Sequence, residues 1–245
     1  MNDPIDVWFH CWCGNQKINI NNSRLLFLIN DKLRKFKISG LYNSINKIFL
    51  VAHNVSPKND FLFDDLSDLY KKIKIIKIPH PLVGNECDTL NEMISYYKNS
   101  NYNANILYVH SKGLSYPENS FIELKMKKWV RYMDLYLIHD WQKNIELLNE
   151  YDTTGCFLFE PDELTRKADE PDNRKTYAGH FWWSKSNYIK SLELISKDYQ
   201  KGRGEFHLLD NNNVKYFNIE TPSWPRELDL HKDEVNDEYI FPEAW

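Results

Sequence analysis

Short apolar segments alternate with amphipathic segments along most of the chain. The short segments are rich in β-branched and aromatic residues, which predicts strands at 5–9, 47–52, 73–78, 105–109, 153–159 and 214–219. Between them, apolar residues recur every three or four positions, which predicts helices at 24–37, 66–72, 88–97, 122–148 and 187–196. This alternation is typical of an α/β fold with a mostly parallel, Rossmann-like central sheet and helices on both faces.

The chain shows no Gly/Ser-rich or Pro-rich linker and no internal repeat. We therefore expect a single domain over residues 1–220. Residues 221–245 are acidic and rich in Pro and Trp, and we expect this C-terminal extension to pack on the domain or to be partly irregular. Nothing in the pattern indicates an oligomeric interface.

Charge and composition argue against several classes of protein. The 31 basic and 35 acidic residues are interspersed, with a net charge of −4, so the basic stripe of a nucleic-acid binder is missing. No apolar run approaches the roughly 20 residues that span a bilayer, and the start of the chain does not resemble a signal peptide. The four cysteines are expected to be free thiols in a reducing compartment, the cytoplasm, or the host cytoplasm for a viral protein.

Polar residues follow several of the predicted strands. Ligands of parallel α/β sheets bind at the carboxyl ends of the strands, so the loops after the first, second and fourth strands are the first candidates for a site. His10, Trp12 and His53 are candidates to contact a nucleotide base and ribose there. Asp88 and Asn91, one helical turn apart on the helix before the fourth strand, are candidates for the same pocket.

Two longer segments carry a resemblance to a known family. They are Asn-Ile-Leu-Tyr-Val-His-Ser-Lys-Gly at 105–113 and Tyr-Ala-Gly-His-Phe-Trp-Trp-Ser-Lys at 177–185. Over about residues 5–219 the chain resembles the GT-A glycosyltransferases, in particular a small group of viral and bacterial capsular-type enzymes with a strand followed by His-Ser/Thr-Lys-Gly. It is more distantly similar to the family-2 glycosyltransferases.

The resemblance implies a GT-A-like sheet and an enzyme of glycan biosynthesis. Such an enzyme moves a hexosyl or deoxyhexosyl group from a nucleoside-diphosphate sugar to a hydroxyl of a glycan or glycoconjugate acceptor, here with inversion. The nucleotide-sugar donor and the glycan acceptor would be its partners. The donor diphosphate is expected at His110, Ser111, Lys112 and Gly113.

The sequence departs from the family at this position. Family-2 enzymes carry Asp-x-Asp here and use it to bind a divalent cation, Mn²⁺ or Mg²⁺, whereas this sequence contains no Asp-x-Asp. Lys112 could instead neutralise the leaving diphosphate directly, as a point cation. His110 is a candidate to ligate a metal or to donate to a phosphate oxygen, so the need for a metal stays open.

The second segment is expected beneath the sugar and the acceptor. Gly179 would permit close approach of the ligand, His180 would bind a hydroxyl, and Trp182 or Trp183 would stack on a sugar ring. The competing interpretation is that Phe181 and Trp183, which share one face of an extended segment, belong to the core.

An inverting transferase also needs a carboxylate that removes the proton of the acceptor hydroxyl. Glu205 occupies the position that resembles that of the family base, and Asp152 is the alternative acid.

Two other functions compete with glycosyl transfer. A sugar nucleotidyltransferase would use a similar sheet, but it usually carries a Gly-rich phosphate loop after the first strand, where this chain has only Gly14. A non-catalytic carbohydrate-binding protein would fit the abundance of aromatic residues, although such modules are usually all-β.

Overall fold

The computed structural model describes most of the chain. The described residues are 3–13, 22–55, 70–78, 86–112, 120–160, 175–196, 204–211 and 213–221, with 63, 65, 66, 68, 114 and 116–118. The expected C-terminal extension lies outside them except for residue 221, as do Gly113 and the segment 79–84.

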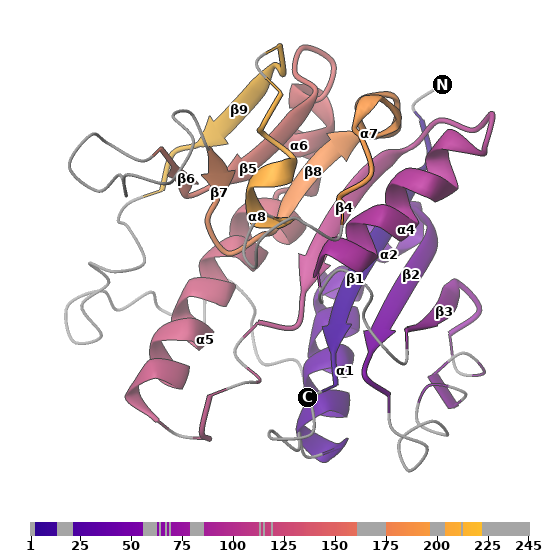
Figure 1. Ribbon diagram of the computed structural model, residues 1–245. Coiled ribbons are helices and arrows are strands. Elements are labelled where there is room, and N and C mark those ends of the chain that lie inside the picture. Colours follow the sequence, from indigo (N-terminus) through magenta and orange to yellow (C-terminus); the bar gives the residue numbers. More distant parts are fainter. Residues whose placement is uncertain are drawn as a thin grey trace.

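A seven-stranded sheet forms the centre of the molecule (Figure 1). Its order is β3-β2-β1-β4-β8-β5-β9. The strands are β1 (Ile5–Trp12), β2 (Ile45–His53), β3 (Ile73–Ile78), β4 (Asn105–His110), β5 (Thr153–Cys156), β8 (Trp182–Lys185) and β9 (Tyr216–Ile219). All neighbouring pairs are parallel except the two that involve β8. A separate antiparallel pair joins β6 (Leu158–Phe159) and β7 (Thr176–Tyr177). The predicted mostly parallel α/β fold is confirmed.

Helices cover both faces of the sheet, as predicted. They are α1 (Asn22–Ile38), α2 (Leu41–Ser44), α4 (Glu86–Lys98), α5 (Phe121–Asp134), the π-helix η1 (Leu135–His139), α6 (Trp141–Leu147), α7 (Ser186–Ser191) and α8 (Gly204–His207). Residues of α1, α5 and η1 share one hydrophobic core with the sheet, while α4 and α7 share a second. None of the described helices combines the length and the hydropathy that a transmembrane segment needs.

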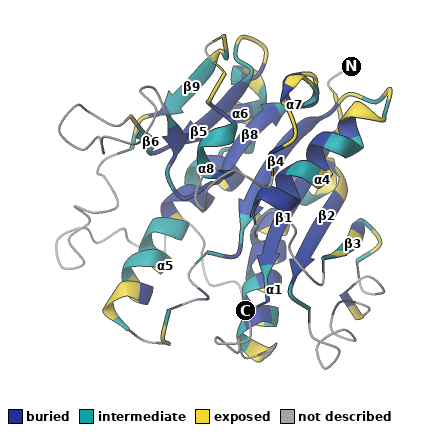
Figure 2. Cartoon of the chain, in the orientation of Figure 1, coloured by how far each residue is buried: buried dark blue, intermediate teal, exposed yellow. Residues whose placement is uncertain are grey.

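Both faces of the central strands are buried (Figure 2). Along β1, Val7 and Phe9 point into the core beneath α1, whereas Trp8 points into the core beneath α4. Side chains alternate between the faces of a strand, so a strand covered on both sides must be apolar at nearly every position. This explains why the central strands appear in the sequence as short uninterrupted apolar runs.

Two predicted elements are interrupted. The predicted helix 122–148 consists of three consecutive helical elements. The α-helix α5 continues into the π-helix η1, and the chain turns at Asp140 before α6 begins. At this turn the Asn144 side-chain amide donates to the carbonyls of Tyr136 and Asp140, at 2.8 and 3.1 Å. The predicted strand 153–159 breaks at Phe157, whose φ of 56° is left-handed.

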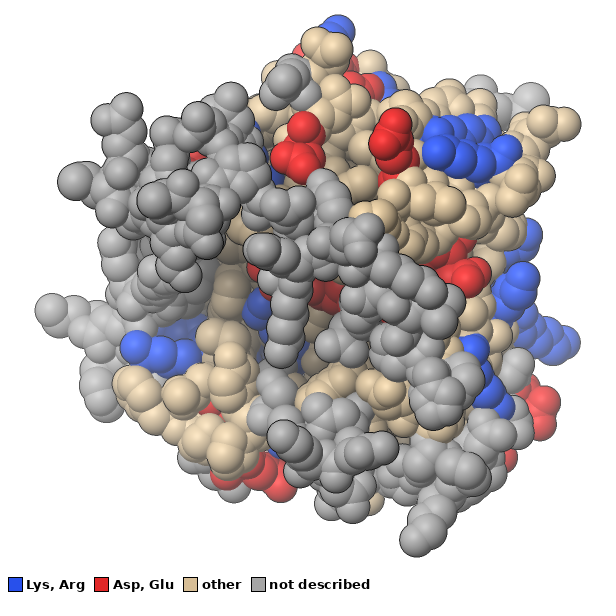
Figure 3. Space-filling model, viewed as in Figure 1, with Lys and Arg blue, Asp and Glu red and all other residues tan. Residues whose placement is uncertain are grey.

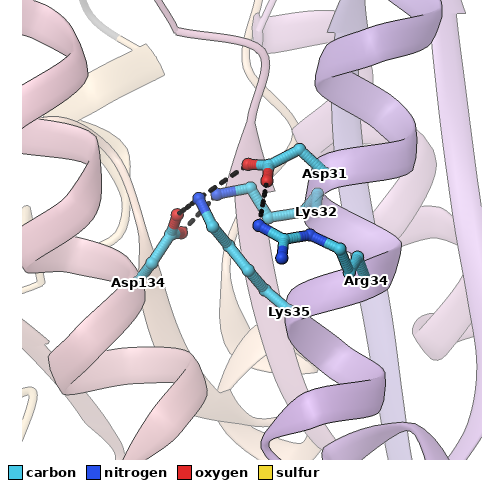
Figure 4. Close-up of polar contacts among 5 residues, drawn as sticks. All are labelled: Asp31, Lys32, Arg34, Lys35 and Asp134. Atoms are coloured by element: carbon cyan, nitrogen blue, oxygen red, sulfur yellow. Dashed lines mark hydrogen bonds and ion pairs between the residues drawn. The ribbon is translucent and has the colours of Figure 1, made fainter. Parts of the chain in front are cut away.

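A buried ion cluster joins α1 to the end of α5 (Figure 4). Asp134 is fully buried and binds the ammonium groups of Lys32 and Lys35, the latter at 2.8 Å. Lys35 also pairs with Asp31 at 2.6 Å. Burial lowers the pKa of Lys32, and Asp134 opposes that shift. The cluster therefore fixes two helices that are about 100 positions apart in the sequence.

Candidate active site

Four histidines come together at the carboxyl edge of the sheet. His10, His53 and His110 lie at or near the ends of β1, β2 and β4, and His180 lies just before β8, whose antiparallel direction puts its start at the same edge. The ring centroid of His10 is 4.7 Å from those of both His53 and His110. Sequence reasoning placed these histidines at two separate parts of a site, and the structure brings them into one group.

Thr89, on α4, links two of these rings. Its hydroxyl lies 2.8 Å from Nδ1 of His10 and 2.7 Å from Nε2 of His53. A hydroxyl has one proton, so it donates to one ring and accepts from the other. Burial lowers the pKa of His10 well below its usual value, helped by the neighbouring His110 and His53. Burial also lowers the pKa of His53 to about 4. Both rings are therefore neutral at pH 7.

Glu86, in the first turn of α4, links the other two rings. Its Oε1 lies 2.5 Å from Nε2 of His110 and 3.0 Å from Nδ1 of His180. Burial opposes ionisation of Glu86, but His110 and His180 outweigh it and hold the pKa of Glu86 well below its usual value. His180 has a left-handed φ of 61°, which is strained for a residue with a side chain. The structure therefore holds a carboxylate between two imidazoles at the edge of the sheet.

Unpartnered polar atoms gather around this group. In the described part of the chain, six buried side-chain nitrogen and oxygen atoms have no hydrogen-bond partner: Nδ1 of His53 and His110, Nε2 of His180, the Tyr108 hydroxyl, and Nε1 of Trp129 and Trp182. Tyr108 stacks on Trp182 at 4.8 Å and lies 5.2 Å from the His180 ring. Native proteins leave few buried polar groups unpaired, and exceptions mark functional or ligand-binding places. All six belong to this edge of the sheet or to the helix beside it.

Lys112 supplies a positive charge beside the histidines. It is half-buried, and its ammonium lies 4.4 Å from the ring centroid of Trp129 on α5. Among the described residues no carboxylate pairs with it. Lys112 therefore lies at the exit of β4, where a role in binding the donor diphosphate stays a prediction, and Gly113 lies outside the described residues.

Glu205 approaches the same region from α8. Gly204, the residue before it, packs so closely on α4 that a Cβ there would lie 3.0 Å from Sγ of Cys87 and 3.7 Å from Cβ of Glu86. Burial raises the pKa of Tyr108 most, and the charges of Glu86, Cys87 and Glu205 raise it further, in that order. Glu205 is therefore near Tyr108. The backbone carbonyl of Glu205 accepts a hydrogen bond of 2.5 Å from Thr176. The short helix thus begins beside the start of α4, where Glu86 lies, and Glu205 is close enough to Tyr108 to act on it electrostatically.

The segment 177–185 differs from its expected role. Trp182 and Trp183 are both fully buried, so neither ring is free to stack on a sugar. They point into opposite cores because β8 is covered on both faces, and Phe181 shares the core of Trp183, as the competing interpretation held. Gly179 permits the close approach of helix α5 and not of a ligand, since a Cβ there would lie 2.4 Å from the sulfur of Met133. Of this segment, His180 contacts Glu86, and the Trp182 ring stacks on Tyr108.

Several other candidate residues have structural partners instead. The Ser111 hydroxyl accepts the backbone N–H of Trp12 at 2.8 Å and so ties the exits of β1 and β4 together. Trp12 packs against the core beneath α1. Asn91 donates to and accepts from the backbone of Ile195, at 3.0 and 2.8 Å. Asp88 is buried at the start of α4, where its charge opposes the lowering of the pKa of His53.

Asp152, the alternative base, lies at the opposite edge of the sheet. It precedes β5, which runs in the same direction as β1 and β4, so it lies at the amino end of the strands. Its carboxylate accepts the backbone N–H of Lys215 at 3.0 Å and pairs with Lys185 at 3.3 Å. The structure therefore does not bring Asp152 to the histidines.

No group of three or more His, Cys, Asp or Glu residues within the described ranges is arranged to hold a metal ion. His110, the candidate ligand, instead contacts Glu86. Glu86, Thr89 and Tyr108 are the residues of this group that sequence reasoning missed. Glu86 had one usable signal, because an acidic residue at the start of a helix that leaves the carboxyl edge of a sheet lies close to the site.

Protonation of His53 gives a test of this geometry. Because its pKa falls from 6.5 unfolded to about 4 folded, the unfolded chain takes up a proton that the folded chain resists. The stability that depends on neutral His53 is therefore present above pH 6.5 and is lost as the pH falls to 4. The loss is about 3 kcal/mol, at about 1.4 kcal/mol per pKa unit. His53→Gln should show a flatter fall of unfolding free energy by chemical denaturation over that range. Parallel curves would contradict the buried neutral ring.

No protein-family model matches the chain, and neither does any curated protein. Solved structures of similar fold include HddC from Yersinia pseudotuberculosis complexed with GMP-PN, which is 13% identical, with 90% of this chain and 91% of that chain covered and a TM-score of 0.48. A protein named as a glucose-1-phosphate thymidylyltransferase from Bacillus anthracis is 11% identical, with 88% and 87% covered and a TM-score of 0.45. A 4-diphosphocytidyl-2C-methyl-D-erythritol synthase from Anaerococcus prevotii is 10% identical, with 89% and 88% covered and a TM-score of 0.42. At these values the likeness carries no argument about the site.

Proposed function

We propose that this protein is a transferase that binds a nucleoside-diphosphate sugar at the carboxyl edge of β1, β2 and β4. The observation that supports this most is that, in the described part of the chain, six buried polar atoms of this edge and of the neighbouring helix α5 have no hydrogen-bond partner. Two of them are indole N–H groups, which only donate, and a third is a phenol O–H. These three donors can be satisfied by a ligand with many oxygen acceptors, such as a sugar diphosphate. Lys112 adds the positive charge that a diphosphate requires.

Glycosyl transfer to an acceptor hydroxyl is the reaction that we propose for this ligand. Glu205 would take the proton of the hydroxyl as its oxygen attacks the anomeric carbon, and the bond to the diphosphate would break. Lys112 would stabilise the negative charge that develops on the leaving diphosphate. Direct attack of this kind inverts the anomeric configuration.

Sugar nucleotidyl transfer is the second candidate. The thymidylyltransferase and the diphosphocytidyl-methylerythritol synthase with similar folds are named for chemistry of this class, although their likeness to this chain is too low to decide. The two reactions use different substrates and release different products. Nucleotidyl transfer joins a nucleoside triphosphate to a sugar phosphate and releases pyrophosphate, whereas glycosyl transfer releases a nucleoside diphosphate from a nucleotide sugar.

A thermal-shift panel tests the proposal. The panel contains nucleoside mono-, di- and triphosphates and nucleotide sugars, each with and without Mn²⁺ or Mg²⁺. A ligand at about 100 times its Kd stabilises the folded state by about 2.7 kcal/mol. We expect at least one nucleoside diphosphate or nucleotide sugar to raise the Tm. If none does, the proposed function is wrong. If the protein instead converts a nucleoside triphosphate and a sugar phosphate into a nucleotide sugar and pyrophosphate, the second candidate is favoured.

Lys112→Ala is expected to weaken binding of the nucleoside diphosphate about 10- to 100-fold, because a charge-assisted contact is lost. Isothermal titration with the diphosphate found in the panel measures this. Lys143→Ala, which removes an exposed lysine from α6, is the matched control and should bind as the wild type does. Unchanged affinity of Lys112→Ala would show that the diphosphate does not lie at the exit of β4.

A further inference from the structure

A single hydroxyl, that of Thr89, joins the rings of His10 and His53. Side chains alternate along β1, so His10 lies on the same face as Trp8, the face that α4 covers. The helix α4 brings Thr89 to both rings, with its hydroxyl 2.8 Å from Nδ1 of His10 and 2.7 Å from Nε2 of His53. All three side chains are buried. The two hydrogen bonds are therefore shielded from bulk solvent, and one hydroxyl makes both.

This hydroxyl allows only two arrangements of the ring protons. Both rings are neutral at pH 7, because burial lowers their pKa values, and a neutral imidazole carries one N–H. In the first arrangement Thr89 donates to Nδ1 of His10 and accepts from Nε2 of His53, so both rings carry their proton on Nε2. In the second arrangement both hydrogen bonds reverse, and both rings carry their proton on Nδ1. The two rings therefore always share one tautomer.

The two remaining ring nitrogens, Nε2 of His10 and Nδ1 of His53, then always differ in character. In the first arrangement Nε2 of His10 is an N–H donor and Nδ1 of His53 is a bare acceptor, and in the second these properties are exchanged. Nδ1 of His53 is buried and has no hydrogen-bond partner within the described part of the chain. The pair therefore offers a ligand one donor and one acceptor in either arrangement, and Nδ1 of His53 is left for that ligand to satisfy.

Charge does not attract a phosphate to these two rings. Acidic and basic side chains occur at several separate places among the described residues on the face that Figure 3 shows. Both rings are neutral, and the acids Asp88 and Glu86 are close enough to act on His53 electrostatically. Recognition at His10 and His53 therefore depends on hydrogen bonds.

The hydrogen-bonding pattern of the pair matches hydroxyl groups. An ionised phosphate oxygen only accepts, so it would satisfy the N–H of one ring and leave the bare nitrogen of the other beside a negative charge. A hydroxyl both donates and accepts. Two hydroxyls of one small polyol can therefore satisfy both rings, whichever of the two arrangements the protons adopt.

We propose that Thr89 couples His10 and His53 into a subsite for the hydroxyl groups of a polyol, either the ribose or the transferred sugar of the ligand. Thr89 is a positioning residue, which sets the protons of the two rings and does not itself touch the ligand. The phosphates of the ligand lie beside Lys112 instead. The identity of the ligand rests on the proposed function, whereas the coupling of the two rings exists without any ligand.

NMR of the histidine ring nitrogens tests the coupling in the free protein. Spectra at pH 7 distinguish a bare ring nitrogen from an N–H, and His10→Gln and His53→Gln assign the signals. We expect two neutral rings with the same tautomer. Thr89→Val removes the hydroxyl and should shift at least one ring toward a mixture of tautomers, whereas Thr89→Ser should keep the wild-type pattern. Thr154→Val is the matched control, because this buried threonine donates to Asn144 at 2.8 Å and not to a histidine.

Isothermal titration tests the assignment to hydroxyl groups. The probes are UDP, GDP, CDP and ADP, their dideoxyribose counterparts, UDP-glucose, GDP-mannose and inorganic pyrophosphate. Thr89→Val should bind the best nucleotide or nucleotide sugar about tenfold more weakly than the wild type, Thr89→Ser should restore the affinity, and pyrophosphate should bind all three proteins equally. If the polyol is the ribose, the dideoxy counterpart binds the wild type more weakly and Thr89→Val weakens it no further. If the polyol is the transferred sugar, only the nucleotide sugars show the loss.

The coupling is overturned if the two rings of the free wild type carry different tautomers, or if either ring is charged at pH 7. The hydroxyl assignment is overturned if Thr89→Val weakens binding of pyrophosphate as much as that of the nucleotides, or if it weakens none of the probes. If no nucleotide binds the wild type, the proposed function is wrong, and D-ribose and D-glucose become the probes. The hydroxyl assignment then fails as well if neither sugar moves the His53 ring signals. The wild-type spectra and the dideoxy probes keep the test decisive if Thr89→Val does not fold.

Discussion

Glu205→Gln is expected to lower the rate of glycosyl transfer by about 10²- to 10⁴-fold, the contribution of a positioned general base, while donor binding is retained. The amide has nearly the shape of the carboxylate but cannot accept a proton. The donor diphosphate, in our proposal, contacts Lys112 and the edge histidines rather than Glu205. The loss should therefore appear in kcat and not in the Kd of the nucleoside diphosphate.

The position of Glu205 is what makes this effect large. Gly204 packs tightly against Cys87, where a Cβ would lie 3.0 Å from Sγ, so α8 begins beside the start of α4, and the charge of its next residue, Glu205, acts on Tyr108. Within the described part of the chain, the Glu205 carboxylate makes no ion pair and no hydrogen bond, whereas the Glu86 carboxylate contacts two imidazoles. A carboxylate that is held by two donors is a weak base, and one with unengaged oxygens is better suited to accept a proton.

Release of nucleoside diphosphate from the donor found in the panel measures the rate, and isothermal titration measures the affinity. Glu92→Gln, an exposed glutamate on α4, is the matched control and should react at the wild-type rate. If Glu205→Gln reacts normally and Glu86→Gln does not, then Glu86 is the base. If both react normally, the base lies outside this group.

The parts of the fold that sequence predicts are those set by local pattern. The strands β1, β2 and β4 contain long apolar runs because both of their faces are covered, and this gives a strong signal. His10, His53 and His110 were found for a related reason, since the first polar residues after such strands must lie at the carboxyl edge. These predictions depend only on the order of residues along one segment.

The parts that sequence does not predict depend on segments far apart in the chain. The tryptophans of 182–183 look like ligand-stacking residues until β8 is known to lie inside the sheet with both faces covered. Asp152 resembles a candidate base until the direction of β5 puts it at the amino edge. Glu86 gains its role only because His110 and His180, from two different strand ends, meet at its carboxylate.

Asp134→Asn is expected to lower the free energy of unfolding by about 3–5 kcal/mol, because it leaves buried ammonium groups without their counter-ion. Asp134 is fully buried, and both Lys32 and Lys35 donate to it. Lys35 keeps Asp31 as a partner at 2.6 Å, so Lys32 bears most of the loss. Chemical denaturation of the wild type and the variant at pH 7 measures the difference. Asp31→Asn, which removes the partly exposed acid of the cluster, should cost much less.

The pH dependence of this loss identifies its cause. Burial already lowers the pKa of Lys32, and without Asp134 only the weaker effect of Asp31 opposes that shift. The folded variant then binds fewer protons than the unfolded chain, so its stability rises with pH toward the pKa of an unfolded lysine, and the deficit against wild type shrinks. A deficit that is constant from pH 7 to 10 would mean lost packing instead.

Replacing the whole cluster, as Lys32→Met/Lys35→Met/Asp134→Leu, should restore most of the stability, because apolar groups of similar volume need no counter-ion. If that variant were as unstable as Asp134→Asn, the unpaired charge would not be the cause.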